Sequence, residues 1–338
     1  MIHVGVDLHQ RFCYMTAVNA SGKLVQAGAV NNQRRALQDY FRQFRGEAVQ
    51  VAVEACGFWP AFREAVAGKV ERLVLVHPQR VKAIASAKLK NDRVDSATLA
   101  HLLRCDLLPE SWQADEETQE RRQQVRLRAT LVRQRTRLKN QVHAVLHQRG
   151  LRSPVSDLFG RRGRQWLEAV KLPGPARETV AVGLRLIDGY SREIEKQNRQ
   201  LREKAQQDER ARCLLSIPGI GVYSAMLLLA EIGNIERFPD KHALCSYAGL
   251  VPRVRESAGK AKRGGITRQG SPWLRWILVE AAQVATRCSP AARAYYQRLR
   301  RKKPAAVARV ALARKLLVAV WALLHQGVAF EETIFAAV

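Results

Sequence analysis

The chain has 338 residues, of which 47% are apolar, so it can form two or three cored domains and is not globally disordered. Its formal net charge of +27 predicts a polyanionic partner, with nucleic acid as the first candidate and an acidic membrane surface as the competitor. No apolar run approaches the roughly 18 residues of a membrane-spanning helix. The six scattered cysteines, without a Cys-x-x-Cys pair, argue against structural zinc and disulfides and favour a reducing cytoplasm.

The first 112 residues predict alternating strands and helices. An acid at position 7 and the lack of a basic start exclude a signal peptide. The turn Asn19-Ala20-Ser21-Gly22 predicts a hairpin, and Asp92 is the expected N-cap of the last helix. This order predicts an α/β domain of the RNase H-like class over residues 1–112. The expected strands are 2–8, 13–18, 24–30, 49–55 and 72–76, and the expected helices are 35–44, 59–67, 79–86 and 92–103.

Residues 113–212 predict a basic helical hairpin. Residues 119–147 contain no Gly or Pro and have Val and Leu at helical spacing, whereas residues 150–175 form a Gly- and Pro-punctuated connection. A second long helix is expected over 176–215, where Ile187, Ile194 and Leu201 recur every seven residues, as in a coiled coil. A mostly α-helical domain is expected over 213–338, with loops at 218–221 and 253–270.

Basic residues are concentrated in two regions of the chain. Residues 1–115 are nearly balanced, with 15 basic and 11 acidic side chains. Residues 121–164 carry 13 Lys and Arg and one acid, and residues 251–315 carry 17 and two. Neutralised phosphates release counterions, so nucleic-acid binding should weaken steeply with salt. Arg121, Arg128 and Arg135 are the candidate phosphate contacts on the long helix.

Four carboxylates of the first domain form a candidate metal site. Asp7 and Glu54 lie in apolar strands, where an unpaired carboxylate is costly to bury. Asp92 and Asp95 are three residues apart and share one helix face. Carboxylate oxygens suit Mg²⁺, and paired ions can clamp a scissile phosphodiester. Taken one at a time, each acid has an ordinary structural role open to it, as a strand end, an Arg partner or a helix cap.

The segment Ile217-Pro218-Gly219-Ile220-Gly221 joins two helical stretches. Two glycines let backbone N–H groups approach a phosphate at a helix N-terminus, as in a helix-hairpin-helix turn that grips the DNA backbone. Gly219 and Gly221 are therefore candidate nucleic-acid contacts. A simple helix–helix turn is the alternative.

A basic, Gly-rich loop over residues 249–270 surrounds a serine. Ser257 lies between basic residues that can bind phosphates and stabilise a phosphoryl-transfer transition state. A hydrogen bond within a turn is the alternative role of this hydroxyl. Ser271 is a rival hydroxyl, but Gly270-Ser271-Pro272 fits a helix N-cap followed by Pro at the first helical position. The candidate phosphate-binding residues of the loop are Arg253, Arg255, Lys260, Lys262 and Arg263.

The joint order of these motifs resembles the DEDD-type insertion-sequence transposases, the bridge-RNA-guided serine recombinases. The resemblance spans nearly the whole chain. This chain has Ser257-Ala258-Gly259 where the family usually has Ser-Gly. The motifs are Gly5-Val6-Asp7, Val53-Glu54-Ala55, Asp92-Arg93-Val94-Asp95-Ser96, Ile217-Pro218-Gly219-Ile220-Gly221, Tyr247-Ala248-Gly249-Leu250-Val251-Pro252 and Glu256-Ser257.

The resemblance implies a RuvC-like domain, a coiled coil and a C-terminal transposase domain. It implies that Asp7, Glu54, Asp92 and Asp95 bind Mg²⁺ and that Ser257 is the nucleophile. It further implies a structured guide RNA that pairs with donor and target DNA. A composite site between protomers, in a homodimer that assembles to a tetramer, is implied as well. The expected location is the bacterial cytoplasm, at the nucleoid when the protein is bound to DNA.

The sequence therefore predicts an RNA-guided DNA recombinase that cuts and rejoins strands through a phosphoserine link. Two alternatives stay open. The first is a RuvC-like Holliday-junction resolvase or endonuclease that uses a metal-activated water and needs no serine. The second is a non-catalytic nucleic-acid-binding protein in which the four acids are structural.

Overall fold

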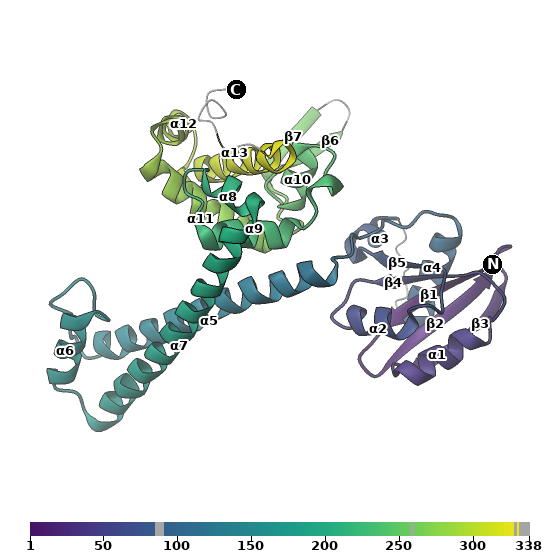
Figure 1. The fold of residues 1–338 in the computed structure, drawn as a ribbon, viewed down its shortest axis with the longest axis horizontal. Helices are drawn as coiled ribbons and strands as arrows, with labels where there is room; N and C mark the ends of the chain where they lie inside the picture. The colour runs from purple at the N-terminus through teal and green to yellow at the C-terminus, as the bar shows by residue number, and fades with distance from the viewer. Residues whose placement is uncertain (85–90, 258–259, 328–329, 331–338) are drawn as a thin grey trace. The chain divides into compact units, whose positions relative to one another are not determined.

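The computed structural model describes residues 1–84, 91–257, 260–327 and 330 (Figure 1). The chain divides into two compact units, Met1–Gln113 and Ala114–Val338, and each is described by itself. A separate boundary near residue 212 stays a prediction. Among the described residues, none of the helices is both long enough and apolar enough to cross a membrane.

A five-stranded mixed sheet forms the centre of the first unit. Its order is β3-β2-β1-β4-β5, with β1, β2 and β3 antiparallel and β4 and β5 parallel to β1. This arrangement is compatible with the predicted RNase H-like start. The strands are β1 (Ile2–Leu8), β2 (Phe12–Asn19), β3 (Leu24–Asn31), β4 (Val49–Glu54) and β5 (Arg72–Val76), and the helices are α1 (Arg34–Arg42), α2 (Trp59–Val66), α3 (Pro78–Ile84) and α4 (Asp92–Arg104).

Helices cover both faces of this sheet. Val4, Val6 and Val51 point to the face that packs against α1 and α2. The intervening positions face the other way, because successive side chains of a strand alternate. On that second face, Ala52 packs with residues of α3 and α4. The alternation therefore assigns Gly5, Asp7 and Glu54 to the α4 side of the sheet.

Helix α4 packs against β1 at Gly5, where only a hydrogen atom fits. A Cβ at this position would collide with the carbonyl oxygen of Ser96 and lie 2.5 Å from the amide nitrogen of Ala100. The hydroxyl of the same fully buried Ser96 lies 2.8 Å from the Thr16 hydroxyl of β2. These contacts determine how closely the first turn of α4 approaches the sheet.

Two long helices of the second unit, α5 (Glu116–His147) and α7 (Gly174–Gln207), run antiparallel and side by side (Figure 1). Arg128 Nε donates to Asn198 Oδ1 at 3.0 Å, and Arg135 Nη1 donates to Ser191 Oγ at 3.4 Å. Since the partner number falls as the α5 number rises, the helices are antiparallel. The buried residues of α7 include the seven-residue series Val180, Ile187, Ile194 and Leu201. A supercoiled, coiled-coil geometry stays a prediction.

Two helices of this region and one helix of the first unit differ from the prediction. The connection 150–175 contains a helix, α6 (Arg161–Ala169). The expected helix 176–215 is interrupted at Asp208, whose side chain accepts a hydrogen bond from the Arg210 amide and caps α8 (Glu209–Leu215). In the first unit, the expected helix 79–86 is α3 (Pro78–Ile84), and its last two residues lie outside the described residues.

The remaining helices share one hydrophobic core, in which helix α9 is nearly all buried. Its Glu231 is 1% exposed, and both carboxylate oxygens accept hydrogen bonds. Arg126 Nε of α5 donates to Oε1 at 2.8 Å, and Ser271 Oγ donates to Oε2 at 3.0 Å. A buried carboxylate is tolerated only when it is paired in this way. These helices are α9 (Val222–Ile232), α10 (Lys241–Tyr247), α11 (Pro272–Cys288), α12 (Pro290–Arg300) and α13 (Ala305–Gln326), with a short 3₁₀ turn, η1, at Ile235–Arg237.

The segment predicted as a loop over 253–270 is largely a β-hairpin, so that prediction is wrong. Strands β6 (Pro252–Ser257) and β7 (Lys260–Ile266) pair antiparallel. The Gly-rich composition indicated irregular backbone, but it is compatible with a two-stranded ribbon whose backbone groups pair with one another. Among the described residues of this segment, the irregular part is residues 267–270, which follow β7.

The Gly5 contact predicts a sharp response to one added methyl group. We expect Gly5→Ala to push α4 off β1 and to destabilise the first unit by about 3 kcal/mol or more, because the obstructing atoms are backbone. Hydrogen exchange followed by mass spectrometry should show loss of protection in α4. Gly28→Ala in β3 is the matched control, since a Cβ there meets no atom within 4 Å. Unchanged protection of α4 in Gly5→Ala would contradict this account.

Candidate active site

The four predicted acids line one cavity of about 250 Å³ in the first unit. Asp7 comes from the end of β1, Glu54 from the end of β4, and Asp92 and Asp95 from the first turn of α4. His9, Asn91 and Leu99 complete the lining. Acids up to 88 positions apart in the chain are therefore brought to one concave site.

The sheet register explains why the two strand acids meet. Strands β1 and β4 are parallel neighbours, and Val6 pairs with Val53. The next residue of each strand is Asp7 and Glu54, so both acids leave the sheet at the same edge. Successive side chains of a strand point to opposite faces of the sheet. Because Val6 and Val53 point to the face covered by α1 and α2, Asp7 and Glu54 belong to the face covered by α4.

The first turn of α4, which carries Asp92 and Asp95, is capped by the residue that precedes Asp92. The N-cap of α4 is Asn91, whose Oδ1 accepts from the Val94 amide at 2.8 Å, so the prediction that Asp92 is the N-cap is wrong. The Asp92 carboxylate is thereby left to face the cavity. Asp92 and Asp95 both lie in the first turn, where the positive end of the helix dipole favours negative charge.

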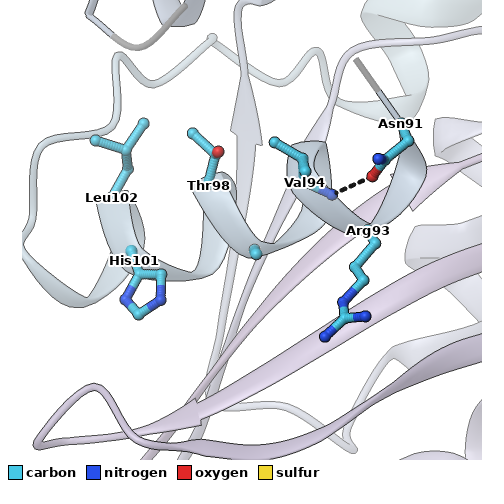
Figure 2. A pocket seen from close by; sticks show the side chains of 7 residues that line it. Asn91, Arg93, Val94, Thr98, His101 and Leu102 are labelled. Carbon is cyan, nitrogen blue, oxygen red and sulfur yellow. Dashed lines mark hydrogen bonds between the residues drawn. The ribbon is translucent and has the colours of Figure 1, made fainter. Parts of the chain in front are cut away.

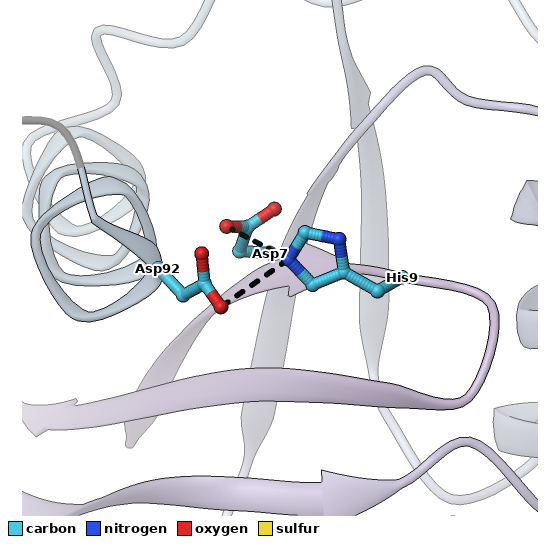
Figure 3. A group of neighbouring side chains, drawn as sticks. All are labelled: Asp7, His9 and Asp92. Carbon is cyan, nitrogen blue, oxygen red and sulfur yellow. Dashed lines mark ion pairs between the residues drawn. The ribbon is translucent and has the colours of Figure 1, made fainter.

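The pKa of the Asp7 carboxyl is shifted upward in this site. Burial raises the pKa of its carboxyl above the usual value; nearby His9 opposes that shift, and Asp92 and Asp95 add to it. His9 lies between two of the acids, with Nε2 3.5 Å from Asp7 Oδ2 and 3.4 Å from Asp92 Oδ2 (Figure 3). These three ligand atoms all lie within 4.8 Å of one another.

The donor set fits a divalent cation. Several carboxylates converge on one cavity, at least one is desolvated, and a cation would offset both the burial and the carboxylate repulsion that raise the pKa of Asp7. A larger hollow of about 620 Å³ lies on another face of α4 and is lined by Arg93, Thr98 and His101 among others (Figure 2). The described residues that line it include no carboxylate, so they offer no comparable site for a hard cation.

The predicted nucleophile lies in the second unit, at the end of β6. Backbone pairing places Ser257 opposite Lys260, where the hairpin turns. The side chains of Arg255, Ser257, Lys260, Lys262 and Arg263 lie outside the described residues, as do Ala258 and Gly259. Arg253 is exposed at the other end of β6 and donates to the Thr267 carbonyl at 3.4 Å.

Backbone contacts determine the position of this hairpin's base. The Thr267 amide donates to the Val251 carbonyl at 2.8 Å, and the Ser271 amide donates to the Tyr247 carbonyl at 2.9 Å. Gly270 has φ +94°, and a Cβ there would collide with the Tyr247 carbonyl oxygen. The Ser271 side chain caps α11 and bonds Glu231, so the predicted N-cap role is confirmed and this hydroxyl is 8% exposed.

The two glycines of the Pro-Gly turn have different surroundings. Gly219 has φ +88°, and a Cβ there would collide with the Ala281 carbonyl oxygen of α11. Close packing against α11 therefore accounts for this glycine without a ligand. Gly221 is the N-cap of α9 and has no atom within 4 Å of an added Cβ. Its surroundings leave room for a phosphate, and its role stays a prediction.

The three predicted arginines of α5 contact the protein itself. Arg121 lies 2.6 Å from Glu117 and 3.5 Å from Asp208. Arg128 stacks its guanidinium 4.1 Å from the Tyr223 ring centroid, and Arg135 reaches Ser191. Arg133 and Arg137 are exposed on the same helix, and the Arg133 guanidinium also lies 4.6 Å from the Trp273 ring centroid. Their role, and that of the three predicted arginines, in nucleic-acid binding stays a prediction.

Two residues were not singled out from the sequence: His9 of the acid cavity and Glu231, which bonds Ser271. His9 lies two residues after a strand acid, and that proximity alone did not indicate a role. Glu231 lies inside Leu-Leu-Leu-Ala-Glu-Ile, and an acid in a fully apolar helical run is a usable signal of a buried, paired carboxylate.

Comparison with known proteins matches both units. A family model described as a DEDD transposase of the IS110 type matches residues 4–149, and one described as the transposase IS116/IS110/IS902 family matches residues 211–297. A "Probable family 20 transposase" of Pseudomonas aeruginosa is 28% identical over 97% of this chain and 98% of its own length.

The chain belongs to the IS110-type family of DEDD insertion-sequence transposases. The transposase for insertion sequence element IS1328 of Yersinia enterocolitica is 28% identical over 83% of this chain and 85% of its own length. The transposase for insertion sequence element IS1111A of Coxiella burnetii is 27% identical over 84% and 78%. Membership implies a DNA-recombination enzyme with DNA substrates. The two matched ranges of this transposase contain the whole acid cavity and the β6–β7 hairpin.

The raised pKa of Asp7 predicts that the metal-free site costs stability. The folded pKa lies above the unfolded value of 3.8, so the ionised form is disfavoured on folding. The cost is fully present above the folded pKa and disappears as the pH falls to 3.8. We expect Asp7→Asn to raise the thermal midpoint in EDTA at pH 7 by roughly 2 °C, with the gain shrinking toward pH 4.

The control for this measurement is Glu64→Gln, an exposed acid of α2. It should leave the midpoint nearly unchanged at both pH values. A lower midpoint for Asp7→Asn at pH 7 would show that the Asp7 carboxylate stabilises the metal-free fold.

Proposed function

We propose that this transposase cuts and rejoins donor and target DNA through a covalent phosphoserine link formed by Ser257. Asp7, Glu54, Asp92 and Asp95 hold the Mg²⁺ that the reaction requires. The observation that carries the proposal is the convergence of these four acids on one cavity. Four acids around a single hollow repel one another, which is costly to a fold that does not use the arrangement.

The acids and the serine have separate tasks. When bound, the metal ion polarises the scissile phosphodiester and stabilises the charge that develops on its oxygens. Asp92 and Asp95 present their oxygens from the first turn of α4, while Asp7 and Glu54 present theirs from the sheet edge. The helix cap and the strand register hold these oxygens in place before substrate binds, which lowers the cost of ordering them.

The covalent step exchanges one phosphate ester for another. The Ser257 oxygen forms a bond to phosphorus as its proton is lost, and the DNA oxygen departs from phosphorus and takes up a proton. Rejoining reverses the exchange: a DNA hydroxyl attacks, and the serine oxygen leaves and regains a proton. The ester count is conserved, so no nucleotide hydrolysis is needed. The cationic side chains beside Ser257 in the sequence supply charge stabilisation to the phosphoryl group.

Resemblance to the family extends the proposal to partners. A structured bridge RNA selects donor and target by base pairing, and the +27 net charge accommodates both RNA and DNA. A homodimer that pairs into a tetramer brings the acids of one protomer to the serine of another.

A second function is favoured by one observation: the acid cavity is formed entirely by the first unit. A RuvC-like resolvase would need only these acids and a metal-activated water. The two mechanisms differ in whether protein becomes attached to DNA, which a single substitution can test.

Ser257→Ala separates the two mechanisms. We expect it to abolish the protein–DNA adduct seen on denaturing gels with labelled DNA, RNA and Mg²⁺, and to reduce recombination by at least about 10³-fold, because no other group replaces the lost oxygen. Ser246→Ala, on an exposed position of α10, is the control. Cleavage of DNA at the wild-type rate by Ser257→Ala would favour the resolvase mechanism. Full recombination by Asp95→Ala would instead favour a non-catalytic binding protein.

The exposed arginines of α5 predict a salt-dependent effect. We expect the double change Arg133→Glu and Arg137→Glu to weaken RNA or DNA binding and to lower the salt slope by about one for each lost phosphate contact. The matched control is Arg42→Glu with Arg45→Glu, exposed in the nearly neutral region. Filter binding over a range of salt concentrations measures the slope. An unchanged slope would mean that this face of α5 does not meet nucleic acid.

A further inference from the structure

We infer that His9 is a nitrogen ligand of the catalytic divalent ion and biases this site toward a transition metal such as Mn²⁺ over Mg²⁺. This inference rests on the metal site of the proposed function. It adds a fifth ligand residue to the four acids, contributed by the connection between β1 and β2.

The first step is the spacing of the ligand atoms. His9 Nε2 lies 3.5 Å from Asp7 Oδ2 and 3.4 Å from Asp92 Oδ2 (Figure 3). Both distances exceed those of ordinary hydrogen bonds. Around an octahedral ion with bonds of about 2.1 Å, adjacent ligands lie about 3 Å apart and opposite ligands about 4.2 Å. The three atoms of this cluster, all within 4.8 Å of one another, match that range after a small contraction.

The second step is how the imidazole is held. The His9 amide donates to the Phe12 carbonyl at 3.0 Å, and Asn32 Nδ2 donates to the His9 carbonyl at 2.9 Å. The ring packs against Phe12 with centroids 4.9 Å apart. The side chain is 42% exposed, yet its Nε2 atom is buried and has no hydrogen-bond partner among the described residues. The ring therefore turns this buried nitrogen toward Asp7 and Asp92.

The third step is the chemistry of the donor set. Mg²⁺ takes oxygen ligands and gives up its water reluctantly, so an added imidazole contributes little to its binding. First-row transition ions bind nitrogen better, and their affinities rise along the Irving–Williams order. A mixed set of one imidazole and several carboxylates therefore strengthens Mn²⁺ binding more than Mg²⁺ binding.

A different role for His9 predicts the opposite sign. If the imidazole acted only as a resident positive charge that neutralises Asp7 and Asp92, it would compete with the metal. Removing it would then raise the affinity for every divalent cation. If it is a ligand, removing it lowers the affinity for Mn²⁺.

The test uses the full chain, its His9→Gln variant and the matched His101→Gln control, which alters an exposed histidine on another face of α4. Mn²⁺ titrations followed by the EPR signal of the free ion give the affinity, and competition with Mg²⁺ gives the ratio. Pulsed EPR of the bound Mn²⁺ detects a directly coordinated ¹⁴N nucleus. Asp7→Asn reports whether the bound ion occupies the acid cavity.

We expect the wild type and His101→Gln to show ¹⁴N coupling and His9→Gln to lose it. We also expect His9→Gln to bind Mn²⁺ at least about tenfold more weakly, with Mg²⁺ affinity changed about threefold or less. Unchanged or tighter Mn²⁺ binding by His9→Gln would overturn the inference, and so would ¹⁴N coupling that persists in this variant. If Asp7→Asn still weakens Mn²⁺ binding in that case, the proposed metal site itself stands. Mn²⁺ binding that is indifferent to Asp7→Asn would overturn the proposed metal site as well.

Discussion

The close contact of α4 with β1 at Gly5 is the constraint on which the acid cavity depends. Because Gly5 has no side chain, the backbone of α4 near Ser96 and Ala100 can approach the strand directly. This approach brings the first turn of α4 to the sheet edge where Asp7 and Glu54 end their strands. A side chain at Gly5 would move the helix acids away from the strand acids. The motif Gly5-Val6-Asp7 therefore couples a packing requirement to a chemical one.

In the second unit, a buried polar network supports the base of the β6–β7 hairpin. Glu231 joins α5, α9 and the N-terminus of α11 through Arg126 and Ser271. Ser271 follows the segment 267–270 that leaves β7. Its side chain is hydrogen-bonded to this carboxylate, and its amide donates to the Tyr247 carbonyl. The strand that ends in Ser257 consequently starts from a fixed base. This polar network and the backbone contacts at Val251 and Tyr247 position the base of the hairpin.

Much of the first unit could be predicted because local signals and tertiary structure agree there. The strands and helices lie within a few residues of the predicted ranges, and the i, i+3 spacing of Asp92 and Asp95 correctly indicated one helix face. Predictions were wrong where two polar neighbours compete for one role, as at Asn91 and Asp92, and where glycines occur inside a strand pair. In each case the outcome depends on backbone geometry that composition does not encode.

By itself, the sequence determined the alternation of strands and helices in the first unit, the two long basic helices, the family and the four candidate acids. These follow from hydrophobic periodicity and from motifs that are local in the chain. Tertiary structure alone decided that the acids share one cavity with His9, that Gly219 packs against α11 and that Glu231 supports Ser271. These facts depend on strand register and helix packing between residues far apart in sequence, where a shift of one residue would reverse which face each side chain occupies.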